Sequence, residues 1–325
     1  MLPAALRFPL LVLFSLTLSS IFYTLSSAFT AGDLSSVSRS LNEWWEVAGL
    51  VAWKTTELAI GWWGEYDGID LASLTLLSHF PPLYLLTTFY AIRPTTILAS
   101  LAIDTLTTYI PFRLLRPIHP THAPIPFRPP RPIHPPPPPS PPPRSISNRP
   151  IIHDSSVLLW TTLLAAAIHA VLLYLSLITW LPLHLVLHFD GLRDISAAHG
   201  AALPYLLAAS LPLGYAAREF LFTPATGARR DLAELKATAF NPETASLAET
   251  LWYNFWGFSK RTRTLVVRTA TLVAVVGVHT WVQVFVTVEG TEAYGAAGWA
   301  AVWAAAAGLT GGAYWWVANV EGVAN

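Results

Sequence analysis

The sequence predicts an all-α polytopic integral membrane protein, with two helical membrane bundles joined by a cytosolic linker rich in proline and arginine. Three observations support this prediction. Of the 325 residues, 53% are hydrophobic and only 12% are charged, whereas soluble domains have about 25% charged residues. Apolar stretches long enough to span a bilayer flank residues 111–153, which contain six arginines and no acidic residue. The 14 tryptophans fit aromatic belts at the membrane–water interfaces.

The central segment sets the predicted topology. Proline fixes φ and lacks the N–H that a helix needs, so we expect residues 111–155 to form an extended polyproline spacer rather than a helix. A short arginine-rich loop beside membrane spans belongs on the cytosolic side. We therefore divide the chain into N-terminal membrane segments (1–110), the linker (111–155) and a C-terminal bundle of four spans (156–325).

The N-terminal segments contribute two to four of the six to eight expected spans. In residues 1–31, Arg7 precedes an apolar run of about 22 residues, long enough for a signal anchor. The small residues near position 28 also fit a cleaved signal peptide, and we favour the anchor. Residues 71–92 form a span that Pro81 and Pro82 interrupt.

Two further N-terminal segments, residues 41–64 and 95–112, either span the membrane or lie flat in its interface. The first has a tryptophan pair at each end, separated by about 27 Å in a helix, which is close to the thickness of the hydrocarbon core. Its charges fall in a stripe of roughly 80° that includes Lys54 and Glu57. The second is apolar apart from Asp104 and several hydroxyl groups.

The C-terminal bundle is expected to contain four spans, at residues 156–180, 201–222, 264–288 and 295–318. The polar loop 223–263 carries six lysines and arginines, and loop 289–294 carries none. The positive-inside rule therefore places the former, the linker and both termini in the cytosol. We expect an endomembrane location, with the endoplasmic reticulum as the organelle.

A histidine pair is the sharpest candidate for chemistry. His184 and His188 are four positions apart, so they share a helix face and could bind one metal ion, with His199 as a third ligand. The motif resembles one histidine box of the membrane desaturases and hydroxylases, which carry several boxes on the cytosolic side. This chain has one, on the predicted lumenal side. Apart from such a metal, no cofactor is predicted, and without cysteine no thiol chemistry is available.

Polar groups fall within the expected spans at His169, His279 and Gln283, and we give Asp104 and His79 the same interpretation with less weight. Intramembrane polar groups either mark a ligand or proton path, or fix helix packing through hydrogen bonds. We favour a packing role.

An aromatic and basic flank precedes the third C-terminal span. Trp252 and Trp256 suit headgroup depth, and Lys260, Arg261 and Arg263 suit anionic lipid phosphates. The alternative is an ordinary span flank. Membrane lipids are thus the predicted partners, a protein partner at the proline-rich linker is a further candidate, and nucleic acid is not expected.

Small residues repeat every four positions in the last span, at Ala300, Ala304, Gly308 and Gly312. Such a stripe lets two helices approach closely, and we expect it to pack against residues 264–288 of the same chain. Gly311 lies off the stripe, so we expect it to tolerate substitution better than Gly308. Trp299 and Trp303, on the other side, are expected to face lipid.

These observations favour a non-enzymatic endomembrane protein that scaffolds partners or organises lipid. Whether the chain is an enzyme stays open, with the negative answer favoured, because no complete catalytic motif is found. One alternative is a lipid-modifying enzyme that uses His184, His188 and His199. The other is a small-solute or proton-coupled transporter that uses the intramembrane polar groups.

Overall fold

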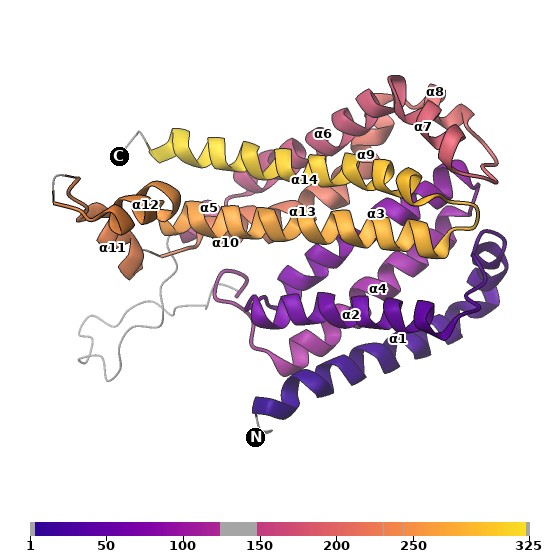
Figure 1. Ribbon diagram of the computed structural model, residues 1–325, viewed down its shortest axis with the longest axis horizontal. Coiled ribbons are helices and arrows are strands. Elements are labelled where there is room, and N and C mark those ends of the chain that lie inside the picture. The colour runs from indigo at the N-terminus through magenta and orange to yellow at the C-terminus, as the bar shows by residue number, and fades with distance from the viewer. Residues whose placement is uncertain (1–3, 124–147, 230, 243, 323–325) are drawn as a thin grey trace, which may run out of the picture.

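The computed structural model describes residues 4–123, 148–229, 231–242 and 244–322, and every regular element within these ranges is a helix (Figure 1). The predicted all-helical fold is therefore confirmed. The long helices are α1 (Ala4–Ser35), α2 (Trp44–Trp63), α3 (Gly68–Phe89), α4 (Pro94–Leu115), α6 (Ser155–Ile178), α9 (Leu203–Ala217), α13 (Lys260–Thr287) and α14 (Ala293–Gly322). The short ones are α5 (Arg149–Ile152), α7 (Leu181–His188), α8 (Ser196–Gly200), the π-helical η1 (Arg218–Phe222), α10 (Thr223–Thr226), α11 (Leu232–Thr238) and α12 (Leu247–Trp256).

The long helices run back and forth along the body, and successive ones are joined at alternate ends (Figure 1). One end holds the start of α1, the α11 and α12 helices and the end of α14. The opposite end holds α7 and α8. Helices α2 and α4, whose segments the sequence left open between spanning and lying flat, both run along the body with the others (Figure 1).

Four described helices are long and apolar enough to cross a membrane: α1 from Leu6 to Ser35, α3, α6 and α13. They coincide with the expected spans 1–31, 71–92, 156–180 and 264–288. Helices α2, α4, α9 and α14 do not reach the same combination of length and apolarity. The expected span 201–222 is a composite, because α9 is continued by η1 and α10.

One core of buried side chains joins the two halves of the chain, which differs from the two separate bundles expected from the sequence. Helix α3 is at its centre and packs against α4, α9 and α13. Most of α3 is buried, including its polar residues Asp70 and His79. An edge-to-face contact between the Tyr66 and Phe220 rings, with centroids 5.2 Å apart, also crosses between the halves.

Helix α4 continues to Leu115, five residues into the segment predicted to be a non-helical linker. Pro111 lies inside it and cannot donate to the carbonyl of Thr107, four residues earlier. The Ser15 hydroxyl of α1 donates to that carbonyl instead, at 2.9 Å. A neighbouring helix thus satisfies the backbone group that proline leaves without a partner, as is common for proline in membrane helices. The polyproline prediction for residues 124–147 falls outside the described residues.

Candidate functional site

The most elaborate group of polar side chains lies within the helical body. We define the buried polar cluster as Tyr23 of α1, Lys54 and Glu57 of α2, His79 of α3, Asp104 of α4 and His279 of α13. Lys54 and Glu57 are three positions apart and therefore share one face of α2. Five helices from both halves of the sequence thus contribute to one site.

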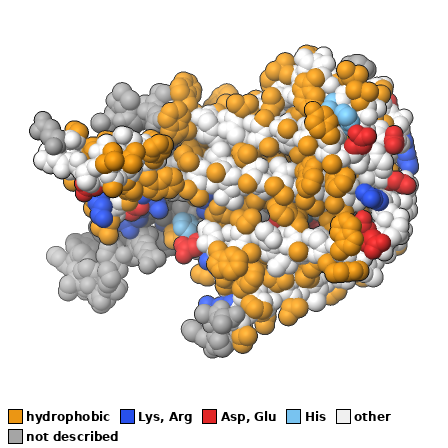
Figure 2. Space-filling model, viewed as in Figure 1, with side chains coloured by type: hydrophobic (Ala, Val, Ile, Leu, Met, Phe, Trp, Pro, Cys, Tyr) orange, Lys and Arg blue, Asp and Glu red, His pale blue; other side chains and the backbone are white. Residues whose placement is uncertain are grey.

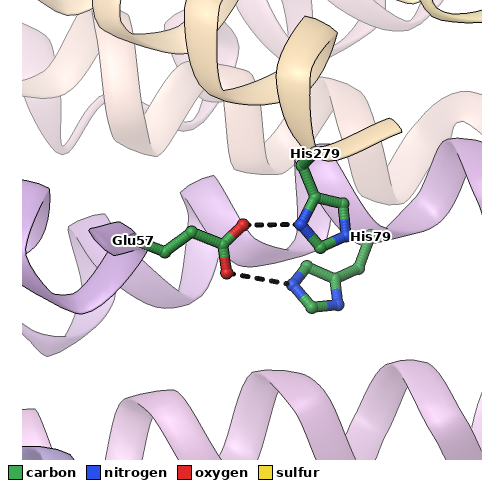
Figure 3. Close-up of side chains that lie close together, drawn as sticks. All are labelled: Glu57, His79 and His279. Carbon is green, nitrogen blue, oxygen red and sulfur yellow. Dashed lines mark hydrogen bonds and ion pairs between the residues drawn. The ribbon is translucent and has the colours of Figure 1, made fainter. Parts of the chain in front are cut away.

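Glu57 is the hub of this cluster. Its carboxylate lies 2.6 Å from Nδ1 of His279 and 3.7 Å from Nε2 of His79 (Figure 3). The indole of Trp53 donates to the same carboxylate at 3.1 Å. The ammonium group of Lys54 lies 3.7 Å away. Because a buried carboxylate is costly unless it is paired, these contacts are needed to keep Glu57 within the body.

His79 continues the cluster toward α4 and α1. Its Nδ1 lies 2.9 Å from Oδ2 of Asp104, and the Tyr23 hydroxyl donates to Oδ1 of Asp104 at 2.8 Å. The rings of His79 and His279 are adjacent, with centroids 3.9 Å apart and planes inclined by 32°. The result is one connected path of polar groups from Tyr23 to His279.

A cavity of about 340 Å³ adjoins the cluster. Its polar lining includes Lys54, His79, Asp104, His279 and Gln283, and its apolar lining comes from α1, α3 and the end of α13. The structure therefore brings together four of the five predicted intramembrane polar residues. The fifth, His169, is buried elsewhere, with Nδ1 2.9 Å from the carbonyl of Ala165 in its own helix.

The sequence did not identify Glu57 or Lys54 as site residues, because both were assigned to the charged stripe of α2. The available signal was that two opposite charges, three positions apart, occupy a segment otherwise long enough to span. From the sequence, His79 has little weight as a polar group within an expected span. Only the fold shows that these residues face His279.

A second group of ionisable side chains holds the start of the linker. Nδ1 of His122 lies 2.9 Å from Oδ2 of Asp67, and Nε2 lies 3.5 Å from Oε2 of Glu219. Burial raises the pKa of Asp67, but the His122 contact and hydrogen bonds from the backbone outweigh it and lower the pKa to about 2. Burial lowers the pKa of His122, but the bond to Asp67 and the nearby acidic groups raise it above 6.5. The described start of the linker is thus bonded to the body.

Asp70 lies beside this group and is fully buried. The guanidinium of Arg268 binds its two carboxylate oxygens, at 2.6 and 2.9 Å. The same guanidinium donates to the carbonyl of Phe220 at 2.9 Å. The ion pair with Arg268 therefore explains how the Asp70 carboxylate can be buried.

The predicted histidine pair makes contacts with the start of α14. Nδ1 of His188 lies 2.7 Å from Oε2 of Glu292, and Nε2 of His184 lies 3.3 Å from the carbonyl of Gly295. The two rings are adjacent, with centroids 4.8 Å apart. His199 belongs to α8, and its side chain is outside the described residues. Within the described part of the chain, three ligand atoms converge in two places: Glu57, His79 and His279 form one group, and Asp67, Asp70 and His122 form the other.

The residues predicted to meet lipid headgroups lie at the junction of α12 and α13. Trp252 and Trp256 are partly exposed, as is Lys260. Arg263 differs from its predicted role because it is buried, donates to the Phe258 carbonyl at 3.0 Å and binds Asp231 at 2.5 Å. It therefore fastens the segment before α11 to α13.

Helix α14 lies against α13, and part of the predicted stripe faces it, since a Cβ at Gly277 of α13 would be 3.6 Å from Ala304. The tightest glycine contact is nevertheless off the stripe. A Cβ at Gly311 would overlap the Thr269 side chain, whereas one at Gly308 would be 3.6 Å from Val273 and one at Gly312 would meet nothing within 4 Å. The expected order of tolerance is therefore reversed. Of the other stripe positions, Ala300 is buried and Ala304 partly buried.

The tryptophans of α14 also differ from expectation, because both are buried rather than facing lipid. Trp299 is 0% exposed and donates to the Pro81 carbonyl of α3 at 3.1 Å. Trp303 packs edge-to-face against Phe80, with centroids 5.7 Å apart. The large rings fill the space between α14 and α3, which the sequence treated as parts of different bundles.

Comparison with known protein families gives a match to the second half of the chain. A family described as the Bouquet formation protein 3 C-terminal domain matches residues 154–316. No curated protein and no solved structure matches the chain. The matched region begins at the N-cap of α6, extends into α14 and covers half of the chain, including His279 of the buried polar cluster. On this match, the chain belongs to the family of the Bouquet formation protein 3 C-terminal domain.

Proposed function

We propose that this chain is a non-enzymatic multi-pass endomembrane protein that scaffolds partners or organises lipid, and that the end of the body where α11 and α12 lie carries this role. The family match suggests a non-enzymatic organising role, since the family is named for bouquet formation. The endoplasmic reticulum is the proposed organelle. The linker and both termini would face the cytosol together with α11 and α12.

The distribution of side chains supports embedding in a membrane. Hydrophobic side chains cover the face of the body in Figure 2, and charged side chains gather toward its two ends. Large apolar residues are exposed along α1 and α6, two of the candidate spans, including Leu13, Leu25, Trp160 and Ile178. Apolar surface of this extent is unfavourable in water and favourable against lipid tails.

The observation that carries the proposal is the surface of α11 and α12. No residue of either helix is buried. Leu232 is 78% exposed, Leu247 is 77% exposed and Phe255 is 75% exposed. The helices border a hollow of about 880 Å³, lined in part by Lys236, Phe240 and Trp252. This apolar, aromatic surface adjoins the basic start of α13, as expected of a segment that rests on an anionic leaflet.

Hydrogen exchange in nanodiscs tests this role. The full chain is reconstituted in neutral lipid, or in neutral lipid with phosphatidylserine, and exchange of the amides of residues 232–256 is followed. We expect slower exchange with the anionic lipid, and Phe255→Asp should abolish the difference. Thr250→Asp adds the same charge about 140° away around α12 and should preserve it. Equal exchange in both lipids, or equal effects of the two variants, would refute the lipid role.

A second candidate function is proton-coupled or small-solute transport, and the cavity beside the buried polar cluster favours it. The cavity places Lys54, His79, Asp104 and His279 around one space between helices, as in proton relays of membrane transporters. Proteoliposomes that enclose a pH-sensitive dye would show proton flux that Asp104→Asn removes. Absence of flux with the unaltered chain would exclude the proton-coupled form of this function.

A further inference from the structure

Three side chains of the buried polar cluster place their ligand atoms close enough together to hold one metal ion. Glu57, His79 and His279 come from three different helices, and each offers a ligand atom within 4.8 Å of the other two. All three are buried, with 7% or less of each residue exposed. Two imidazoles and one carboxylate are the protein ligands of many zinc sites that keep a fourth position open.

The imidazole nitrogens leave coordination capacity unused. Nε2 of His79 is buried, makes no hydrogen bond to any described residue, and faces Oε2 of Glu57 at 3.7 Å (Figure 3). Nε2 of His279 is also buried without a hydrogen bond within the described part of the chain. A buried polar atom without a partner costs about 1–3 kcal/mol. A ligand that used the His79 nitrogen would remove this cost.

The surroundings of His79 match those of a metal-bound histidine. Its other nitrogen, Nδ1, faces Asp104 at 2.9 Å, and Tyr23 donates to the second oxygen of Asp104. Metal-ligating histidines usually donate their second N–H to a carboxylate, which fixes the tautomer and orients the free lone pair toward the ion. Asp104 therefore has a positioning role, and Tyr23 orients Asp104.

The net charge of the cluster also favours a bound cation. With neutral imidazoles, the two carboxylates of Glu57 and Asp104 exceed the single ammonium of Lys54 by one negative charge. An unbalanced charge in the interior is strongly unfavourable. Lys54 is the group that competes with an ion, since its ammonium lies 3.7 Å from Glu57. It also donates to Thr108 at 3.3 Å, a contact that it could keep when an ion binds.

We propose that Glu57, His79 and His279 bind one divalent transition-metal ion of the zinc class. The adjoining cavity would supply water to the fourth position. This site joins α2 and α3 to α13, so a bound ion would link the two halves of the chain. The proposal does not depend on the lipid-organising function, because α11 and α12 are not part of the site.

Cobalt titration of the purified full-length chain, freed of metal by chelation, tests this proposal. Tetrahedral cobalt with nitrogen and oxygen ligands absorbs visible light, and zinc should displace it. We expect one ion per chain, and His79→Ala and His279→Ala should each lose it. His169→Ala is the matched control, because it removes a buried histidine from another place, and it should bind as the unaltered chain does.

Two milder variants keep the test valid if the alanine variants do not fold. Asp104→Asn leaves all three ligands in place and should weaken zinc binding about 10–100-fold. Lys54→Met removes the competing charge and should tighten zinc binding. Absence of the cobalt spectrum in the unaltered chain would overturn the proposal and leave the cluster holding protons only. Binding that survives in both alanine variants and is lost in His188→Ala would overturn it in favour of the histidine pair of α7.

Discussion

The rings of His79 and His279 are in contact, with their centroids 3.9 Å apart and their planes inclined by 32°, although the residues are 200 positions apart in the sequence. His79 lies in α3, before the linker, and His279 lies in α13, after it. Glu57 reaches both rings (Figure 3). The linker therefore does not separate two independent bundles, because the polar groups and the apolar core both bridge the halves.

The ion pair between Asp70 and Arg268 is expected to be a major bond between these halves. Arg268→Met would leave the fully buried carboxylate of Asp70 without its partner, and breaking a buried pair costs about 3–5 kcal/mol. The free energy of unfolding in mixed micelles measures this cost. The double variant Asp70→Leu, Arg268→Met should be more stable than Arg268→Met alone, because it leaves no unpaired charge.

A control for this pair is available on the surface. Arg93 binds Asp33 at 2.7 Å, but its side chain is 62% exposed. The guanidinium of Arg93 is open to water and Asp33 keeps a bond from Thr96 at 2.6 Å, so Arg93→Met should change the unfolding free energy far less than Arg268→Met. Equal effects of the two substitutions would contradict the importance assigned to burial.

Glycines of α14 should differ in their response to alanine. At Gly311 the new methyl group would overlap Thr269 of α13, whose branched side chain is stiff. Overpacking of this kind costs about 1–3 kcal/mol. Gly312→Ala meets open space and should be neutral or stabilising by up to about 1 kcal/mol, since alanine favours helix. Thermal unfolding in detergent by circular dichroism distinguishes the two variants, and similar midpoints would show that α13 and α14 are not in close contact at Gly311.

The group that holds the start of the linker should make stability depend on pH. The folded pKa of His122 is raised above 6.5, so its contribution is complete below that pH and is lost as the pH rises through the folded value. The folded pKa of Asp67 is lowered to about 2, so its contribution is present above 3.8 and is lost as the pH falls toward 2. The melting temperature should therefore decline on the alkaline side, and His122→Gln should flatten that decline. An unchanged alkaline profile in His122→Gln would assign the pH dependence to other groups.

The helices themselves followed from local sequence patterns. Apolar runs identify α1, α3, α6 and α13, because length and composition alone predict a spanning helix. The extension of α4 through Pro111 could not be predicted in this way, because it depends on a hydroxyl of Ser15 almost a hundred positions away. The burial of Trp299 likewise depends on the carbonyl of Pro81 in another helix.

The candidate site could be predicted only in part, because it too depends on contacts between helices that are distant in the sequence. Polarity within an apolar span identifies Asp104, His279 and Gln283, and the structure places all three around one cavity. Periodicity along α2 reveals that Lys54 and Glu57 share a face, but it does not reveal what that face meets. The pairing of His79 with Asp104 results from the packing of α3 against α4, which no local pattern encodes.

The arrangement of the chain across a membrane is the claim on which the proposed function depends most. Glycosylation mapping in microsomes tests it directly, with acceptor sites inserted in extended loops next to Thr291 and next to Ala245. The proposed topology places Thr291 in the lumen and Ala245 in the cytosol, so only the Thr291 site should be modified. Modification of the Ala245 site would contradict it.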